Sequence, residues 1–237
     1  MAFSDRVVHV AACDLVVCRD AWGFAETHKD AIEAHWARRT ADNPNFFNGT
    51  IFVLGAAHIA GDTFHGFFLK TDFRSFLYWR EQAFPAAGAR DAFGSAIIRA
   101  GDGSVLLGRQ SAGNVNSGLA YPPGGFIDQR DVDGTGHIDL AASIARELSE
   151  ETGLAVHTSD VTPGYIFTFD GSLVSMGIEY RFSADADALR ATILAHTATE
   201  AKPELADIVI VRSAADIDGA RVPPYTTRLL RHLFQTA

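Results

Sequence analysis

The stretch from residue 139 to residue 154 constrains this chain more than any other part of the sequence. If it forms a helix, steps of about 100° per residue gather its largest apolar side chains on one side: Leu140, Ile144 and Leu148. Glu151 then falls inside this apolar arc, and Gly153 follows where helices are commonly capped. An acidic run usually lies on a solvated helix face, but here one carboxylate is directed toward the core. The pattern therefore predicts a helix whose acidic residues have a function.

Three carboxylates of this helix are expected to meet on one patch. Glu150 and Glu151 follow Glu147 by three and four positions, the spacing of neighbours on a helix surface. Like charges this close repel one another unless a cation lies between them, and Mg²⁺ prefers oxygen ligands. The Gly124-Gly125 pair upstream allows a close approach of the backbone. The sequence therefore predicts a metal site made by the three glutamates and the carbonyl of Gly125, with that of the adjacent Gly124 as the alternative.

The nine residues that begin at Arg146, Arg-Glu-Leu-Ser-Glu-Glu-Thr-Gly-Leu, resemble the second half of the Nudix box. That box reads Gly, five residues, Glu, seven residues, and then Arg-Glu-aliphatic-x-Glu-Glu-x-Gly-aliphatic. The first half departs, because Gly125 lies 21 residues before Arg146 where the box expects 14. We therefore expect a seven-residue insertion at 130–136 and no glutamate in the first half of the box. Asp139 is the nearest carboxylate that would replace it, with His137 as the alternative.

The resemblance implies a fold of the α/β class. Residues 89–237 are expected to form the Nudix α/β/α sandwich around a mixed sheet, and residues 1–88 a small α+β extension. Hairpin signals and apolar runs on both sides of the box agree with this order of strands and helices. The extension is a candidate for substrate recognition or for a homodimer interface.

The resemblance also implies the roles of the box residues. Glu147 and Glu151 would bind Mg²⁺ directly, with Mn²⁺ as the alternative ion. Glu150 would be a third ligand or an anchor, which Arg146 orients from one helical turn away. In the family a carboxylate outside the second half of the box often acts as base or ligand. The candidates here are Asp139, Glu179 and Glu204.

Three residues in the approach to the glycine pair are candidate substrate-binding residues: Arg109, Asn116 and Tyr121. Arg109 would bind phosphate, although a single arginine after a strand more often lies at the surface. Tyr121 would stack on a base or a sugar, or would pack beside the following Pro-Pro pair.

The first 88 residues carry a second, shorter resemblance. Segment 35–49, which runs from His-Trp-Ala-Arg-Arg to Asn-Pro-Asn-Phe-Phe-Asn-Gly, and segment 73–79, Phe-Arg-Ser-Phe-Leu-Tyr-Trp, are similar to the N-terminal region of Nudix enzymes that hydrolyse UDP-glucose and UDP-galactose. Core packing would explain the aromatic residues equally well. This resemblance implies a nucleotide sugar that is cleaved to a nucleoside monophosphate and a sugar 1-phosphate.

Two other functions stay open. The chain would be a Nudix hydrolase of ADP-ribose, of a dinucleotide or of coenzyme A, since fold alone does not select a substrate. Alternatively, it would be a non-catalytic ligand sensor that keeps the fold. The missing glutamate of the first half favours a sensor, whereas the three glutamates of the second half argue against it.

Composition bears on the partners. The net charge of −9, without a basic run, argues against nucleic-acid binding. The sequence has no 18-residue apolar run and no signal peptide at its start, so no membrane association is expected. Cys13 and Cys18 lack metal-binding spacing, and a reducing, cytoplasmic location is expected. The partner that the resemblance implies is a small-molecule nucleoside diphosphate, and the acidic composition does not exclude it.

Overall fold

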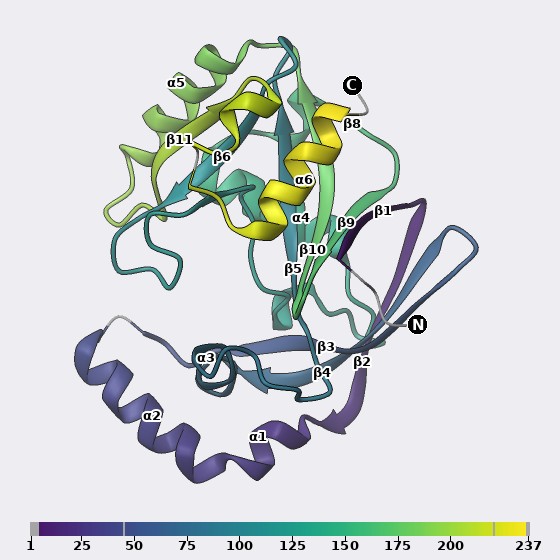
Figure 1. Ribbon diagram of the computed structural model, residues 1–237, viewed down its shortest axis with the longest axis vertical. Helices are drawn as coiled ribbons and strands as arrows, with labels where there is room; N and C mark the ends of the chain where they lie inside the picture. Colours follow the sequence, from purple (N-terminus) through teal and green to yellow (C-terminus); the bar gives the residue numbers. More distant parts are fainter. Residues whose placement is uncertain (1–4, 45, 220, 236–237) are drawn as a thin grey trace.

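The computed structural model describes residues 5–44, 46–219 and 221–235, and two β-sheets form its framework (Figure 1). The larger sheet has the strand order β1-β9-β10-β5-β6-β11, with β7 paired to β6 and β8 paired to β10. Its strands are β1 (Arg6–Val10), β5 (Asp91–Arg99), β6 (Val105–Gln110), β7 (Ala120–Tyr121), β8 (Ser159–Val161), β9 (Tyr165–Asp170), β10 (Leu173–Phe182) and β11 (Leu205–Val211). β10 runs parallel to β5 but antiparallel to β9, so the sheet is mixed, as predicted.

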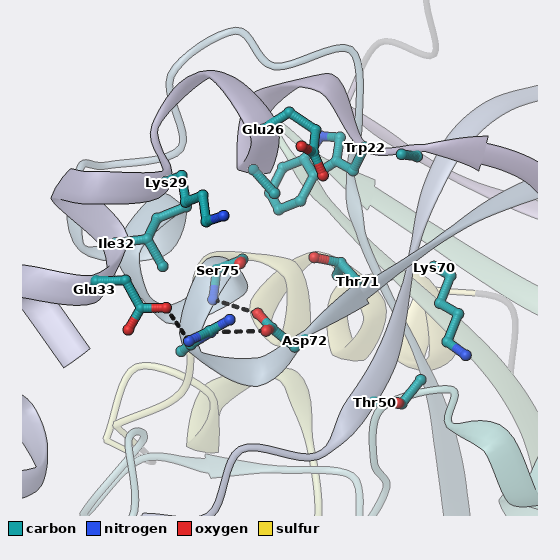
Figure 2. A pocket seen from close by; sticks show the side chains of 13 residues that line it. Trp22, Glu26, Lys29, Ile32, Glu33, Thr50, Lys70, Thr71, Asp72 and Ser75 are labelled. Atoms are coloured by element: carbon teal, nitrogen blue, oxygen red, sulfur yellow. Dashed lines mark hydrogen bonds and ion pairs between the residues drawn. The ribbon is translucent and has the colours of Figure 1, made fainter.

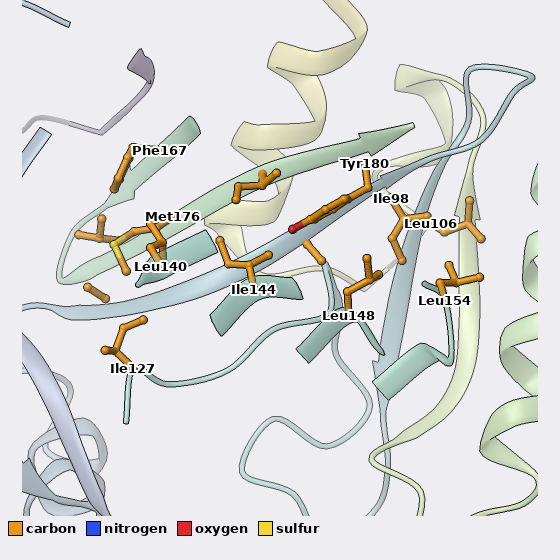
Figure 3. Close-up of a cluster of buried hydrophobic side chains, with 14 of the residues drawn as sticks. Ile98, Leu106, Ile127, Leu140, Ile144, Leu148, Leu154, Phe167, Met176 and Tyr180 are labelled. Atoms are coloured by element: carbon orange, nitrogen blue, oxygen red, sulfur yellow. The ribbon is translucent and has the colours of Figure 1, made fainter. Parts of the chain in front are cut away.

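Helices cover both faces of the larger sheet. They are α4 (Leu140–Thr152), α5 (Ala186–Thr197) and α6 (Pro224–Gln235). On one face α4 contributes Ile144 to the core (Figure 3), and α5 adds Ile193 to the same cluster. α6 packs Leu229 against the other face, in front of the strands in Figure 1. Gly94 of β5 lets α4 approach, because a Cβ atom there would lie 2.9 Å from Cγ1 of Ile144. The result is the α/β/α sandwich that the sequence predicts.

The smaller sheet, with the strand order β2-β4-β3, lies in the N-terminal part of the chain. The elements of this part are β2 (Ala12–Ala21), α1 (Gly23–Thr27), α2 (Lys29–Asp42), β3 (Thr50–Ala60), β4 (Thr63–Asp72) and α3 (Phe73–Glu81). One face of the sheet contributes Phe52 and Phe64 to the main core. The opposite face packs Ile51 against Phe76 and Trp79 of α3. The aromatic residues of α3 therefore have at least a packing role.

Segment 7–17, which reads as one strand or a bent pair, is a bent pair whose halves enter different sheets. β1 pairs antiparallel with β9, from Arg6↔Phe169 to Val10↔Tyr165, whereas β2 runs parallel to β4. The larger sheet thus takes a strand from the region that we predict to be the extension. The division into residues 1–88 and 89–237 stays a prediction.

The motif at 35–49 lies in α2 and in the loop that follows it, and Asn45 falls outside the described residues. Nε2 of His35 lies 2.7 Å from Oε2 of Glu81 on α3. The rings of Trp36 and Phe46 stack with centroids 6.2 Å apart. Phe47, in contrast, is 81% exposed. Most of the motif therefore holds α2 in place, and one aromatic side chain stands in solvent.

Two further findings concern the chain beyond its layers. Within the described ranges, no helix combines the length and the apolar character that crossing a bilayer requires. Cys13 and Cys18 are both free thiols on β2.

Candidate active site

α4 forms as the sequence predicts, and its ends show why. The Asp139 side chain caps its start by accepting a hydrogen bond from the amide of Ala142 at 2.9 Å. Gly153 ends the helix in the left-handed conformation, with φ 69°. Its apolar stripe packs on β5 and so fixes the rotation of the helix, which turns Glu151 inward. Asp139 therefore serves the helix terminus.

Glu151 is the unusual residue of this helix, because it is a carboxylate that is only 4% exposed. Its Oε1 accepts a hydrogen bond from the Gly124 amide at 2.7 Å, and its Oε2 has no hydrogen-bond partner among the described residues. Burial raises its pKa well above the ordinary value, and the charges of Glu204 and Glu147 raise it further. A buried oxygen left in this way is suited to a cationic ligand.

The two glycines before the helix are required by their distances to neighbouring groups. A Cβ atom on Gly124 would lie 2.0 Å from the Gly94 carbonyl oxygen, and one on Gly125 would lie 2.9 Å from Cδ of Glu147. The Gly125 carbonyl accepts a hydrogen bond from the Gly94 amide at 3.0 Å, which leaves it one lone pair. Backbone and carboxylate thus meet at this point, as the sequence indicates.

Arg146 shows where the first half of the box continues. Its Nη2 lies 2.7 Å from Oδ1 of Asp131, a carboxylate that is buried, and Nη1 contacts Glu147 and lies 3.5 Å from Oε2 of Glu150. Asp131 follows Gly125 after five residues, which is the spacing that the box gives its first glutamate. It lies in the 3₁₀ helix η1 (Gln129–Asp131).

This pairing corrects our placement of the insertion at 130–136. The additional residues come after Asp131, so the first-half carboxylate is present as an aspartate. Counting forward from Gly125, and not backward from Arg146, would have found it. Nδ1 of His137 instead lies 3.6 Å from Oδ1 of Asp14, and the backbone of His137 pairs with Val16 of β2.

Of the other two candidate carboxylates, the structure brings Glu204 to the box helix. Glu204 precedes β11 and is an exposed residue. Partial desolvation of its carboxylate nevertheless raises its pKa, and the charges of Glu200 and Glu150 raise it further. Its charge also raises the pKa of Glu151 and Glu147. Glu179 instead contacts Arg99 and lies 2.9 Å from Nη2 of Arg181.

Of the candidate substrate-binding residues, Asn116 lies in the segment 111–119 and the other two flank it. We call this segment the approach loop because it precedes β7 and the glycine pair. Arg109 donates to the Gly118 carbonyl at 2.8 Å, within this loop. Asn116 donates from Nδ2 to the Tyr121 hydroxyl at 2.9 Å. Burial raises the pKa of Tyr121, whose ring lies 6.5 Å from that of Tyr225. All three residues therefore already have internal partners, and their roles toward a substrate stay predictions.

The residues fit a divalent cation by their chemistry, although the carboxylates are not gathered around one point. Over residues 5–44, 46–219 and 221–235, no three His, Cys, Asp or Glu side chains are grouped so as to hold a metal ion. Glu147 is turned to Arg146, and the exposed Arg130 side chain comes within 3.9 Å of Glu147 and 4.0 Å of Glu150. The unpartnered Oε2 of Glu151 and the adjacent carbonyl of Gly125 are the donors that oxygen-seeking cations use.

A cavity of about 350 Å³ lies elsewhere, in the N-terminal part of the chain (Figure 2). Its walls come from α1, α2, the strands of the smaller sheet and the start of α3. Arg74 pairs there with Asp72 at 2.8 Å and with Glu33, and Lys29 lies beside them. No residue of α4 or of the glycine pair lines it, so this cavity is separate from the box carboxylates.

Comparison with known proteins agrees with these features. Residues 88–208, half of the chain, match the NUDIX domain family. No curated protein matches the chain. Similar solved structures include the MutT protein from Methanosarcina mazei Go1, at 21% identity over 62% of this chain and 94% of that chain with a TM-score of 0.41. A C. elegans Ap4A hydrolase is 14% identical over 61% of this chain and 96% of that chain, with a TM-score of 0.42.

A bifunctional NMN adenylyltransferase/ADP ribose pyrophosphatase from Francisella tularensis, in complex with AMP and a Mn ion, is 17% identical over 68% of this chain and 46% of that chain, with a TM-score of 0.43. Nudix enzymes typically use divalent metal ions and act on nucleotide-type substrates. The match over half of its length shows that the chain belongs to the Nudix family of pyrophosphohydrolases.

Proposed function

We propose that this hydrolase uses Mg²⁺, with Mn²⁺ as the alternative ion, to cleave the pyrophosphate bond of a nucleotide sugar such as UDP-glucose. The main support for a bound metal ion is the environment of Glu151. Within the described residues, this nearly fully buried carboxylate lies among Glu147, Glu150 and Glu204, with one oxygen unpartnered and no cationic side chain bound to it. Such an arrangement is costly for the fold unless a ligand supplies the positive charge.

Each residue of the box has a role in holding the ion in this proposal. Glu147 and Glu151 bind the ion, together with Glu150 and the free lone pair of the Gly125 carbonyl. When bound, the ion neutralises phosphate oxygens and makes a water molecule more acidic. Asp131 holds Arg146, and Arg146 holds Glu147 and Glu150 in place.

Glu204 acts as the general base in this proposal, because its raised pKa makes it a stronger base than an ordinary glutamate. It accepts a proton from the attacking water, whose oxygen forms a bond to one phosphorus. The bond between this phosphorus and the bridging oxygen breaks, and the bridging oxygen leaves on the other phosphate. The products are a nucleoside monophosphate and a sugar 1-phosphate.

The N-terminal part supports the choice of substrate. Its motif at 35–49 resembles that of the UDP-sugar enzymes, and Phe47 in this motif is 81% exposed. Asn43 donates to the carbonyl of Gly113 at 3.1 Å, so the motif loop adjoins the approach loop. A solvent-exposed aromatic ring in a loop that adjoins the approach loop is suited to stack on a base or a sugar.

A substrate panel tests this proposal. We expect release of phosphate, after treatment of the products with a phosphatase, to be fastest with UDP-glucose among UDP-glucose, ADP-ribose, NADH and coenzyme A in Mg²⁺. Phe47→Ala should raise KM for UDP-glucose, whereas Phe67→Ala, a change of a partly exposed phenylalanine on β4, should not. Cleavage of ADP-ribose but not of UDP-glucose would overturn the assignment of a nucleotide sugar as the substrate. Binding of all four compounds without turnover would instead identify a sensor.

A further inference from the structure

We propose that the N-terminal extension acts on the reaction through the approach loop, with Arg80 and Asn116 as positioning residues for Glu204 and for the Tyr121–Gly124 segment. The kinetic part of this inference rests on the proposed function, whereas its structural part does not.

The approach loop cannot hold its own shape firmly. Its sequence, Ser-Ala-Gly-Asn-Val-Asn-Ser-Gly-Leu, contains no helix or strand, and Gly113 and Gly118 adopt positive φ angles of 92° and 77°. Its internal backbone bonds are turn-like, such as Asn114 N to Ser111 O at 3.4 Å. Segments of this kind open readily on their own, because few buried contacts hold them.

Two side chains of the extension fix this loop from outside. Arg80, near the end of α3, donates from Nη2 to Oδ1 of Asn116. Asn43, directly after α2, donates from Nδ2 to the carbonyl of Gly113. The loop is therefore held at two points about three residues apart by elements that belong to the smaller sheet and its helices.

The same loop contacts both sides of the candidate active site. The amide of Ser111 donates to the Glu204 carbonyl at 2.9 Å, and Nδ2 of Asn114 approaches the same oxygen at 3.3 Å. Asn116 uses its other amide end to donate to the Tyr121 hydroxyl at 2.9 Å. Tyr121 begins the Tyr-Pro-Pro-Gly run that ends at the amide bound to Glu151.

Asn116 is thus the link in one chain of hydrogen bonds from α3 to the glycine pair. Its carbonyl oxygen serves Arg80 and its amide group serves Tyr121, so both ends of the side chain are in use. Loss of either contact frees the loop to move, and the Glu204 backbone moves with it. Because catalysis is sensitive to displacements of about 1 Å, a loosened loop should lower turnover without removing any catalytic group.

The test compares three variants in the full chain: Arg80→Ala, Asn116→Ala and Arg74→Ala. Arg74 is the matched control, because it lies on the same helix and loses pairs with Asp72 and Glu33 but has no contact with the approach loop. Hydrogen exchange of residues 111–119 is measured without substrate, and kcat and KM are measured with the substrate that the panel selects.

We expect exchange of 111–119 to become at least about tenfold faster in Arg80→Ala and Asn116→Ala. In both, kcat should fall about tenfold with KM within about twofold of wild type. Arg80→Lys, which keeps the charge and one donor, should recover part of the loss. Arg74→Ala should leave exchange in the loop and kcat unchanged, even if it melts at a lower temperature.

Three results would overturn the inference. Unchanged exchange in the loop would show that Arg80 and Asn116 do not fix it, whatever the activity. Faster exchange with unchanged kcat would remove the positioning role, and a raised KM with unchanged kcat would make Asn116 a substrate contact instead. If wild type cleaves none of the four compounds, the proposed function fails, while the exchange data still decide whether the loop is held from the extension.

Discussion

Two glutamates with equal exposure, Glu151 and Glu179, lie on opposite faces of the larger sheet in opposite surroundings. Each is 4% exposed. Glu179 alternates along β10 with Ile178 and Tyr180, which face α4, so its side chain lies on the α6 side between Arg99 and Arg181. Glu151 has one amide donor and three other glutamates that raise its pKa.

The comparison separates two uses of a buried charge. On the α6 side, arginines neutralise the carboxylate, so the fold is complete without a ligand. On the α4 side, like charges are kept together and one oxygen of Glu151 has no partner among the described residues, so ionisation of this carboxylate is costly until a cation balances it. Burial alone does not distinguish a functional carboxylate from a structural one. The charge of the side chains around it, positive at Glu179 and negative at Glu151, does.

The largest effect is expected for Glu151→Gln. The amide keeps the shape but removes the charge, so we expect activity to fall about 10² to 10³-fold, which corresponds to roughly 3–4 kcal/mol in the barrier. The metal-free variant should melt at or above the wild-type temperature, because a buried charge among like charges is gone. Kinetics in Mg²⁺ and thermal unfolding in a chelator measure both. A rate above about a tenth of wild type would contradict the metal-binding role.

Glu179→Gln should give the reverse pattern. It leaves Arg99 buried without its carboxylate, so we expect the free energy of unfolding to fall by about 3 kcal/mol. Activity per folded molecule should stay within about twofold. Urea unfolding measures the first quantity, and replacing Glu179 and Arg99 together by Leu and Met should recover much of the loss. A fold that tolerates Glu179→Gln but loses activity would reverse the assignment of the two faces.

Asp91 extends the comparison to pH. It is buried at the start of β5, and burial raises its pKa to about 7, against the opposing charge of Arg80. The folded protein then retains a proton that the unfolded chain releases near pH 4, so stability is lost as pH rises from about 4 through 7. Asp91→Asn should remove this loss, on the order of 2 kcal/mol between pH 5 and pH 8. If the stability of wild type and of Asp91→Asn changed with pH in the same way, Asp91 would not be the group responsible.

The smallest effects concern the two aspartates near the start of α4. Asp131→Asn frees Arg146 and should lower kcat about tenfold, or roughly 1.4 kcal/mol. Asp139→Asn should leave kcat unchanged, because Asn caps a helix about as well as Asp. Steady-state kinetics of the two variants under one condition decide between them. If only Asp139→Asn were slow, Asp139 and not Asp131 would replace the first-half glutamate.

Local patterns predicted the helix and sheet framework well because they depend on neighbours in the chain. The apolar stripe of α4, the cap at Gly153 and the close approach at Gly124 all follow from residue spacing. The sequence left Glu179 and Glu204 undecided, since the face of a sheet and the presence of Arg99 depend on tertiary structure. Our misplaced insertion arose because we counted residues backward from Arg146, across the additional residues, whereas the spacing forward from Gly125 reaches Asp131.

The pairing of β1 with β9 has a consequence for how the chain is made. A ribosome synthesises Arg6–Val10 before its partner in the sheet, which follows only about 160 residues later. At usual rates of translation, this strand waits on the order of ten seconds or more without a neighbour. During that interval Val7, Val8 and Val10 are an open edge to which another nascent chain can add. This strand therefore leaves the ribosome well before the partner that protects it, and strong expression favours its pairing with neighbouring nascent chains.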